Sequence, residues 1–254
     1  MCYDIKAGLE AQLKRAQKHG DLQAIDEIIQ KLVPLTDLPL HHATGFNHPE
    51  VLIYTNESPF FPMVATWGLV PPWVNDEVQL KKIWNSTINA RGETIFEKPS
   101  FKNAANNNRC IIYIDGFYEH HHFNGKTFPF FIKNKTGKPL ALAGLYSLYK
   151  DGNGGKITTF TIVTTKGNSL LEKIHNNPKL SEPRMPLILT EEDEDKWLNP
   201  LIEDLKESRI KELKKEYPAE KLEAYTVKRL RGKAYVGNIA EISQPFKYEE
   251  LTNF

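Results

Sequence analysis

Stretches rich in β-branched and aromatic residues recur along this chain and limit the folds open to it more than any other feature. They predict strands over residues 51–54, 63–70, 109–118, 127–133, 140–149, 157–165 and 224–228. Asn124-Gly125 and the glycine-rich run 151–155, which separate neighbouring strands, are typical of hairpin turns. Because the strands follow one another without regular βαβ alternation, the pattern predicts an α+β protein with a curved or barrel-like, mostly antiparallel sheet core and flanking helices.

Helical periodicity is strongest near the N-terminus. Residues 8–32 place apolar side chains at helical spacing, and Gly20-Asp21 divides them into two helices, with Asp21 as the N-cap of the second. We expect this helical hairpin to shield one side of the core and a short strand to precede it over residues 2–6.

Two further helices are predicted in the C-terminal part. Thr190 is placed to cap an acidic helix over 191–198, and a longer charged helix follows over 200–217. We find no internal repeat, low-complexity segment or linker. The chain is therefore expected to form one domain over 1–254, with the helices over 8–32 and 200–217 at its periphery.

Composition excludes several classes of protein. The only cysteines are Cys2 and Cys110, which rules out a disulfide framework and fits a reducing compartment. The formal net charge is +1, so a site for a polyanion would have to come from local clusters of Lys and Arg. No stretch approaches the ~20 apolar residues of a membrane span, and the N-terminus lacks the apolar run of a signal peptide. We expect a cytoplasmic monomer that contacts no membrane.

The chain opens Met1-Cys2, and removal of Met1 would leave a thiol and an α-amine on adjacent carbons. With pKa values of roughly 7.7 for the amine and 8.5 for the thiol, both are partly nucleophilic near neutral pH. Such a group condenses with an aldehyde through an imine and closes to a thiazolidine, which an internal cysteine cannot do because its nitrogen is an amide. Taken alone, however, a cysteine after the initiator methionine is more often an accident of sequence.

Two segments combine groups that suit nucleic acid or phosphate. Trp67 and Trp73 bracket a proline-rigid turn, which serves either core packing or the stacking of nucleobases. Alternation along an extended segment places Asn89 and Arg91 on one face, where an amide and a guanidinium suit an oxyanion or a phosphate. A surface salt bridge is the alternative for Arg91.

Two titratable residues are candidates for proton transfer. Glu119 follows an apolar strand and an aromatic pair, so partial burial would raise its pKa towards neutrality. The alternative is a solvated glutamate at a strand end. His175 carries the side chain that most readily exchanges a proton near pH 7, although a lone histidine is more often structural.

The run His120-His121-His122 does not indicate a metal site. Strand alternation allows at most His120 and His122 to converge, and no cysteine or carboxylate pair lies at zinc-like spacing nearby. The chain also lacks a Walker loop, a dinucleotide glycine fingerprint and a nucleophile elbow. We expect neither a metal nor any other cofactor.

Taken in order, these segments resemble the SOS response-associated peptidase family, which shields abasic sites in DNA. The resemblance is carried by Met1-Cys2, residues 67–71 with Trp73, residues 89–93, Arg109-Cys110, residues 116–119, residues 143–145, Ile174-His175 and residues 184–186. Each motif is weak alone, but the ordered set is specific and covers most of the chain.

The resemblance implies a DNA-repair protein that senses abasic sites in single-stranded DNA and has autopeptidase and lyase-like activities. Cys2, freed by removal of Met1, would form a thiazolidine with the ring-opened aldehyde of the abasic sugar. Asn89 would hold the N-terminus and the sugar, and Glu119 would act as acid and base. His175 would move protons during opening of the sugar ring.

The same resemblance implies a positive groove for single-stranded DNA. The predicted contact residues are Trp67, Trp73, Arg91, Arg184, Lys228, Arg229 and Arg231. For the basic segment 228–231, an ordinary solvated patch is the alternative.

Three departures from the family pattern bear on DNA affinity. Tyr3-Asp4 follows Cys2 where the family usually has Gly-Arg, His120 replaces the usual tryptophan, and residues 176–183 form an insertion. Asp4 would repel phosphate. Together with the low net charge, this predicts modest and salt-sensitive binding.

Two other functions remain open from the sequence. A non-covalent single-stranded DNA-binding module predicts that blocking Cys2 leaves DNA binding intact. A conventional cysteine peptidase using Cys2 and His175 predicts turnover of an unrelated peptide.

Overall fold

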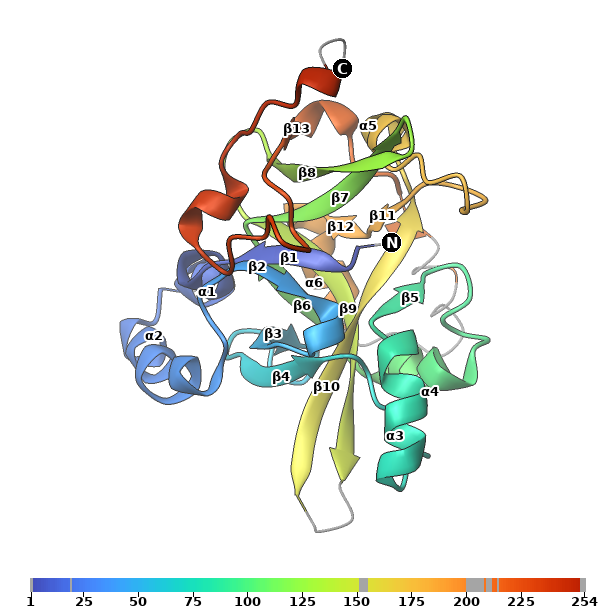
Figure 1. The fold of residues 1–254 in the computed structure, drawn as a ribbon. Coiled ribbons are helices and arrows are strands. Elements are labelled where there is room, and N and C mark those ends of the chain that lie inside the picture. The colour runs from blue at the N-terminus through green and yellow to red at the C-terminus, as the bar shows by residue number, and fades with distance from the viewer. Residues whose placement is uncertain are drawn as a thin grey trace.

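Two β-sheets that share one core form the body of the protein (Figure 1). The computed structural model describes residues 2–18, 20–150, 155–199, 208, 212–213 and 215–251. The first sheet has the order β13-β8-β7-β1-β2. Its strands are β1 (Asp4–Ala7), β2 (Leu40–Thr44), β7 (Gly116–Phe123), β8 (Lys126–Asn134) and β13 (Leu222–Thr226).

The second sheet has the order β11-β10-β4-β3-β6-β9-β12, and β5 pairs with β10 beside this path. Its strands are β3 (Glu50–Thr55), β4 (Met63–Trp67), β5 (Asn89–Arg91), β6 (Arg109–Ile114), β9 (Leu140–Lys150), β10 (Lys156–Lys166), β11 (Arg184–Pro186) and β12 (Ile188–Leu189). Because β9 also pairs with β10, the strands β10, β4, β3, β6 and β9 form a closed ring. Among the residues described, only the pairings of β10 with β4 and β5 are parallel, so the predicted barrel-like, mostly antiparallel α+β fold is confirmed.

Most predicted strands match the structure to within a few residues. The prediction of one strand over 109–118 is wrong, because the chain leaves the second sheet after β6 and enters the first sheet as β7. At this crossing the Asp115 carboxylate accepts a hydrogen bond from the Gly8 backbone at 2.6 Å. A Cβ on Gly116 would lie 2.5 Å from the Ile132 carbonyl oxygen, so the close approach requires glycine. The crossing carries Glu119 to the side of β1.

The N-terminal helices only partly fulfil their prediction. They are α1 (Leu9–Lys18) and α2 (Leu22–Glu27), and a π-helical turn over Ile28–Leu32 continues the second. The Asp21 carboxylate accepts a hydrogen bond from the Ala24 backbone at 3.0 Å, which confirms the predicted N-cap. Helix α1 buries one face, whereas α2 has no buried residue. The core is therefore shielded mainly by α1.

The remaining helices lie around the two sheets (Figure 1). They are α3 (Glu77–Ile83), α4 (Pro99–Asn107), α5 (Ser169–Ile174) and α6 (Glu191–Leu198), and the sequence predicted only α6. Thr190 occupies the N-cap position of α6 as expected, but its hydroxyl donates to the Asp193 carboxylate at 2.8 Å and makes no capping hydrogen bond to the helix backbone. The predicted helix over 200–217 falls largely on residues outside those described, as does most of the turn 151–155. No helix among the described residues is long and apolar enough to cross a bilayer.

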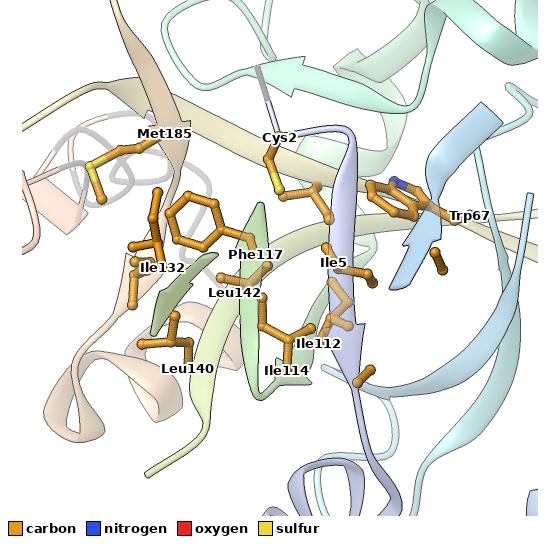
Figure 2. Close-up of a cluster of buried hydrophobic side chains, with 14 of the residues drawn as sticks. Cys2, Ile5, Trp67, Ile112, Ile114, Phe117, Ile132, Leu140, Leu142 and Met185 are labelled. Atoms are coloured by element: carbon orange, nitrogen blue, oxygen red, sulfur yellow. The ribbon is translucent and has the colours of Figure 1, made fainter. Parts of the chain in front are cut away.

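Both cysteines are fully buried. Cys2, two residues before β1, belongs to the apolar cluster between the two sheets, and Figure 2 shows its side chain among Ile5, Trp67 and other members of that cluster. Cys110 lies on β6 and belongs to the same cluster. The packing of the core thus fixes the position of Cys2.

Candidate functional site

Four elements bring the predicted catalytic residues to one place. Cys2 precedes β1, Asn89 begins β5, Glu119 lies within β7 and His175 follows α5. The Asn89 side-chain amide donates to the Cys2 carbonyl oxygen at 2.8 Å. Because β1 pairs with β7 so that Asp4 lies opposite Tyr118, Glu119 lies beside the start of β1. The Glu119 carboxylate is 3.4 Å from Nδ1 of His175.

Glu119 is buried, with only 6% of its surface exposed. Burial raises the pKa of its carboxyl to about 7, because the charged form loses the solvation of water. A hydrogen bond from the His120 backbone to Oε1, at 3.1 Å, acts in the opposite direction. Near neutral pH this carboxyl is therefore present in both protonation states and is suited to give and to take a proton.

His175 is held in a neutral state. Its Nδ1 lies 3.0 Å from the Arg184 carbonyl oxygen, 3.3 Å from the Arg184 backbone nitrogen and 3.4 Å from the Glu119 carboxylate. Burial lowers the pKa of His175 to about 4. A neutral imidazole keeps one unprotonated ring nitrogen, with which it can accept a proton.

The Cys2 thiol is not set up as a thiolate. Burial, followed by the charge of Glu119, raises its pKa far above the usual value. Its sulfur lies 4.0 Å from the Asp4 carbonyl oxygen. A fully buried thiol of this kind stays protonated at neutral pH, so it does not act as an independent nucleophile in the way of a cysteine peptidase.

A pocket of about 450 Å³ opens beside these residues. Glu119 and His175 line it together with Tyr3 and Asp4, the two residues that follow Cys2. The rest of the lining includes His120, His122, Arg229 and Arg231. The pocket thus joins a proton-transfer pair to two arginines.

The segment 176–183 forms part of the pocket wall. The Asn176 side chain accepts a hydrogen bond from the His122 backbone at 2.7 Å and donates one to its carbonyl oxygen at 2.9 Å. Asn177 and Leu180 line the pocket. The inserted residues therefore shape the space in front of His175.

The predicted DNA contacts divide into exposed and buried groups. Trp73 is 48% exposed, and Arg91 and Lys228 are also exposed. Trp67 is fully buried, and its indole nitrogen donates to the Ile88 carbonyl oxygen at 2.9 Å. A direct contact between Trp67 and DNA is therefore excluded in this structure, and its role is core packing.

Arg184 is also misassigned as a DNA contact. Its guanidinium is buried and makes two hydrogen bonds to the Glu93 carboxylate, at 2.9 and 2.8 Å, and one to Glu182 at 2.9 Å. It also donates to the Thr164 carbonyl oxygen at 2.9 Å. Arg184 therefore ties β11 to its neighbours and presents its own carbonyl to His175.

These placements predict opposite outcomes for two arginines. We expect Arg184→Gln to lower the free energy of unfolding by about 1–3 kcal/mol, because Glu93, Glu182 and the Thr164 carbonyl oxygen lose a charged donor that is itself buried. The exposed Arg91→Gln should change it by less than about 0.5 kcal/mol and instead weaken DNA binding. Urea unfolding followed by circular dichroism checks the first effect. Equal stability of the two variants would contradict a structural role for Arg184.

Asp4 belongs to a cluster that the sequence analysis missed. Asp4 is buried, with 2% of its surface exposed. Its carboxylate lies 3.1 Å from Nε2 of His42 and 2.9 Å from the Arg231 guanidinium. Burial alone would raise the pKa of Asp4, but His42 and Arg231 outweigh it and hold the pKa below its usual value. Asp4 is therefore a paired carboxylate and not the bare charge that the sequence suggests. No sequence signal reveals partners 38 and 227 positions away.

The three consecutive histidines alternate as their strand requires. His120 and His122 line the pocket, whereas His121 is buried with Nδ1 3.1 Å from the Lys173 carbonyl oxygen. Within the described ranges, no group of three or more His, Cys, Asp or Glu side chains is arranged to hold a metal ion.

Comparisons with known proteins give a consistent result. Residues 39–234 match the profile of the family described as SOS response associated peptidase (SRAP). The Bacillus subtilis (strain 168) abasic site processing protein YoqW is 44% identical over 165 residues, which cover 65% of this chain and 68% of that protein. The abasic site processing protein HMCES of Rattus norvegicus is 32% identical over 167 residues, which cover 55% of this chain and 44% of that protein.

A solved structure extends the likeness to nearly the whole chain. The crystal structure of a protein from Bacteroides thetaiotaomicron has a TM-score of 0.81 and 32% identity, and the match covers 97% of this chain and 100% of that one. The matched family range begins at residue 39, after Cys2. The match to the family profile therefore does not include Cys2.

Proposed function

Because the chain belongs to the SOS response associated peptidase (SRAP) family, we propose that it recognises abasic sites in single-stranded DNA and crosslinks to them through Cys2 after losing Met1. Relatives named abasic site processing proteins support the substrate class. The observation that carries the proposal is the convergence of Cys2, Asn89, Glu119 and His175 beside a pocket with two arginines.

The proposed reaction joins the aldehyde of the ring-opened abasic sugar to both groups of Cys2. The α-amine adds to the aldehyde carbon, and the resulting carbinolamine loses water to give an imine. The thiol then adds across the imine, so that a carbon–sulfur bond forms and the thiol proton passes to nitrogen. One water leaves overall. A thiol that stays protonated fits this order, because the amine attacks first.

Glu119 and His175 supply the proton transfers. With a pKa of about 7, Glu119 protonates the departing hydroxyl of the carbinolamine and then takes a proton back. Neutral His175 takes the proton of the anomeric hydroxyl while the bond from the anomeric carbon to the ring oxygen breaks, and the ring oxygen takes up a proton to leave the open-chain aldehyde. Asn89 holds the Cys2 carbonyl and so fixes the direction of the α-amine.

We extend the role of Glu119 to the loss of Met1. Hydrolysis of the Met1-Cys2 peptide bond needs a base that activates a water molecule, and Glu119 is the partly ionised carboxylate beside Cys2. The bond between the Met1 carbonyl carbon and the Cys2 nitrogen breaks, and the nitrogen takes up the proton. This step frees the amine that the crosslink requires.

A conventional cysteine peptidase is the less favoured function. Such an enzyme needs a thiolate paired with a histidine. Here the thiol is fully buried and lies against the Asp4 carbonyl oxygen, while Nδ1 of His175 faces Glu119 and Arg184. A non-covalent DNA-binding module would explain the arginines but not the arrangement of proton-transfer groups.

The test uses the wild-type protein and a single-stranded oligonucleotide with one abasic site. We expect a heat-stable adduct on a denaturing gel, and intact-mass spectrometry should assign it to protein without Met1 plus DNA minus one water. Undamaged DNA and DNA carrying tetrahydrofuran, an abasic analogue without an aldehyde, should give no adduct. Loss of Met1 without any adduct would refute the crosslinking mechanism. Cleavage of an unrelated peptide would favour the peptidase.

A further inference from the structure

The Asp4 carboxylate connects the N-terminal strand to the C-terminal segment. One of its oxygens faces Nε2 of His42 on β2, and the other accepts a hydrogen bond from Arg231. The other ring nitrogen of His42 lies 3.0 Å from the Tyr235 hydroxyl. Asp4 is thus the centre of a buried polar cluster that begins two residues after Cys2.

The segment that carries Arg231 has no helix or strand to hold it. Residues 228–239 are irregular, and they reach β2 through polar side chains. The Asn238 side-chain oxygen accepts hydrogen bonds from the His41 and His42 backbones, at 2.6 and 3.0 Å. These contacts fix one end of the segment on β2, and the ion pair with Asp4 fixes the arginine itself.

Arg231 is accessible from the pocket although it is paired. Its side chain is 58% exposed and lines the pocket, whereas the side chain of Asp4 is 3% exposed. A guanidinium has five N–H donors, so one bond to Asp4 leaves donors for a second anion. An anion that enters the pocket can therefore reach the exposed arginine, whereas the Asp4 side chain, which also lines the pocket, is almost fully covered.

We propose that Asp4 is a positioning residue that holds Arg231 as a phosphate-binding arm at the pocket. The inference rests on the proposed function, because the phosphate is one that flanks the abasic site in single-stranded DNA. A guanidinium held in one orientation loses less side-chain entropy when it binds a phosphate. Asp4 therefore favours DNA binding although its own charge is negative.

The experiment measures binding of single-stranded DNA containing tetrahydrofuran by fluorescence anisotropy over a range of salt concentrations. Removal of a bare negative charge would tighten binding. We expect the opposite for Asp4→Asn, a loss of roughly three- to tenfold in affinity. Arg231→Gln should lose at least as much and lower the slope of log K against log salt by about 0.7, the value for one phosphate on a single strand.

A double variant separates positioning from other effects of Asp4. If Asp4 acts through Arg231, Asp4→Asn should change affinity little in the Arg231→Gln background. Asp26→Asn removes an exposed carboxylate on α2 and serves as the matched control, with unchanged affinity expected. Thermal melting of every variant shows whether a loss of binding reflects a loss of fold.

Several experimental results would overturn the proposal. It is overturned if folded Asp4→Asn binds as tightly as wild type or more tightly, or if its loss persists in the double variant. If Asp4→Asn does not fold, Arg231→Gln alone tests the proposal. Unchanged affinity and an unchanged salt slope in Arg231→Gln would show that Arg231 does not bind a phosphate. Crosslinking of wild type to true abasic DNA tests the proposed function separately. If wild type crosslinks while Arg231→Gln binds normally, only the arm fails, and if wild type neither binds nor crosslinks, both fail.

Discussion

A Cys2→Ala variant is expected to form no heat-stable adduct with abasic DNA. Alanine at position 2 keeps the α-amine after Met1 is lost but has no thiol to capture the imine. The imine therefore hydrolyses back to aldehyde and amine, whereas the wild-type thiazolidine survives heating. Borohydride should still trap the imine of the variant as a covalent adduct. Denaturing gels with and without borohydride measure both species.

The matched control is the other cysteine. Cys110 lies buried on β6 in the same apolar cluster, so Cys110→Ala makes a similar change in packing without touching the proposed chemistry. We expect Cys110→Ala to retain the heat-stable adduct. Intact-mass spectrometry must show that both variants lack Met1. A heat-stable adduct formed by Cys2→Ala without reductant would assign the crosslink to another nucleophile and refute the mechanism.

The architecture was largely accessible from sequence because its determinants are local. The stretches 127–133, 140–149 and 157–165 each carry β-branched and aromatic residues between turn signals, and they became β8, β9 and β10. The run 109–118 was wrongly predicted as one strand because it is apolar almost throughout. Its division at Asp115 depends on contacts with Gly8 and the Lys6 carbonyl oxygen, which no local pattern shows.

The sequence predicted only part of the site, for a related reason. Residue types near Cys2 and the order of motifs pointed to Asn89, Glu119 and His175, and the structure brings these side chains together. Sequence shows that a residue is charged but not which partner neutralises it. Arg184 is paired with Glu93, 91 positions away, so the assignment of this arginine to DNA failed.

The Asp4 cluster is a second case in which the sequence does not show the partner of a charged residue. A lone acidic residue two positions after Cys2 predicts repulsion of DNA, whereas the folded chain pairs it with Arg231. The sequence also does not show which side chains are exposed, since Trp67 and Trp73 are the same residue type only six positions apart. One is fully buried and the other is 48% exposed. Tertiary contacts decide between packing and binding for such residues.

Glu119→Gln is expected to slow crosslinking at pH 7 by at least about 100-fold, the usual contribution of a general acid or base. The wild-type rate should rise as the α-amine loses its proton, near pH 7.7 by its ordinary value. It should fall as Glu119 loses its proton, with a pKa of about 7. The result is a bell-shaped profile with its maximum between these values. Once Met1 has been removed from it with an aminopeptidase, as shown by intact mass, the variant should keep only the rising limb. Single-turnover gel assays at several pH values measure it.

Stability distinguishes lost catalysis from misfolding. Because burial raises the Glu119 pKa from 4.5 to about 7, the folded state holds its proton more tightly than the unfolded state does. This contribution to stability is complete below pH 4.5 and is lost as the pH rises through 7. Glutamine cannot ionise, so Glu119→Gln should be at least as stable as wild type at pH 8 while it crosslinks far more slowly. Glu249→Gln, which removes an exposed carboxylate, should change neither property. A bell-shaped profile that survives in Glu119→Gln would assign the acid to another group.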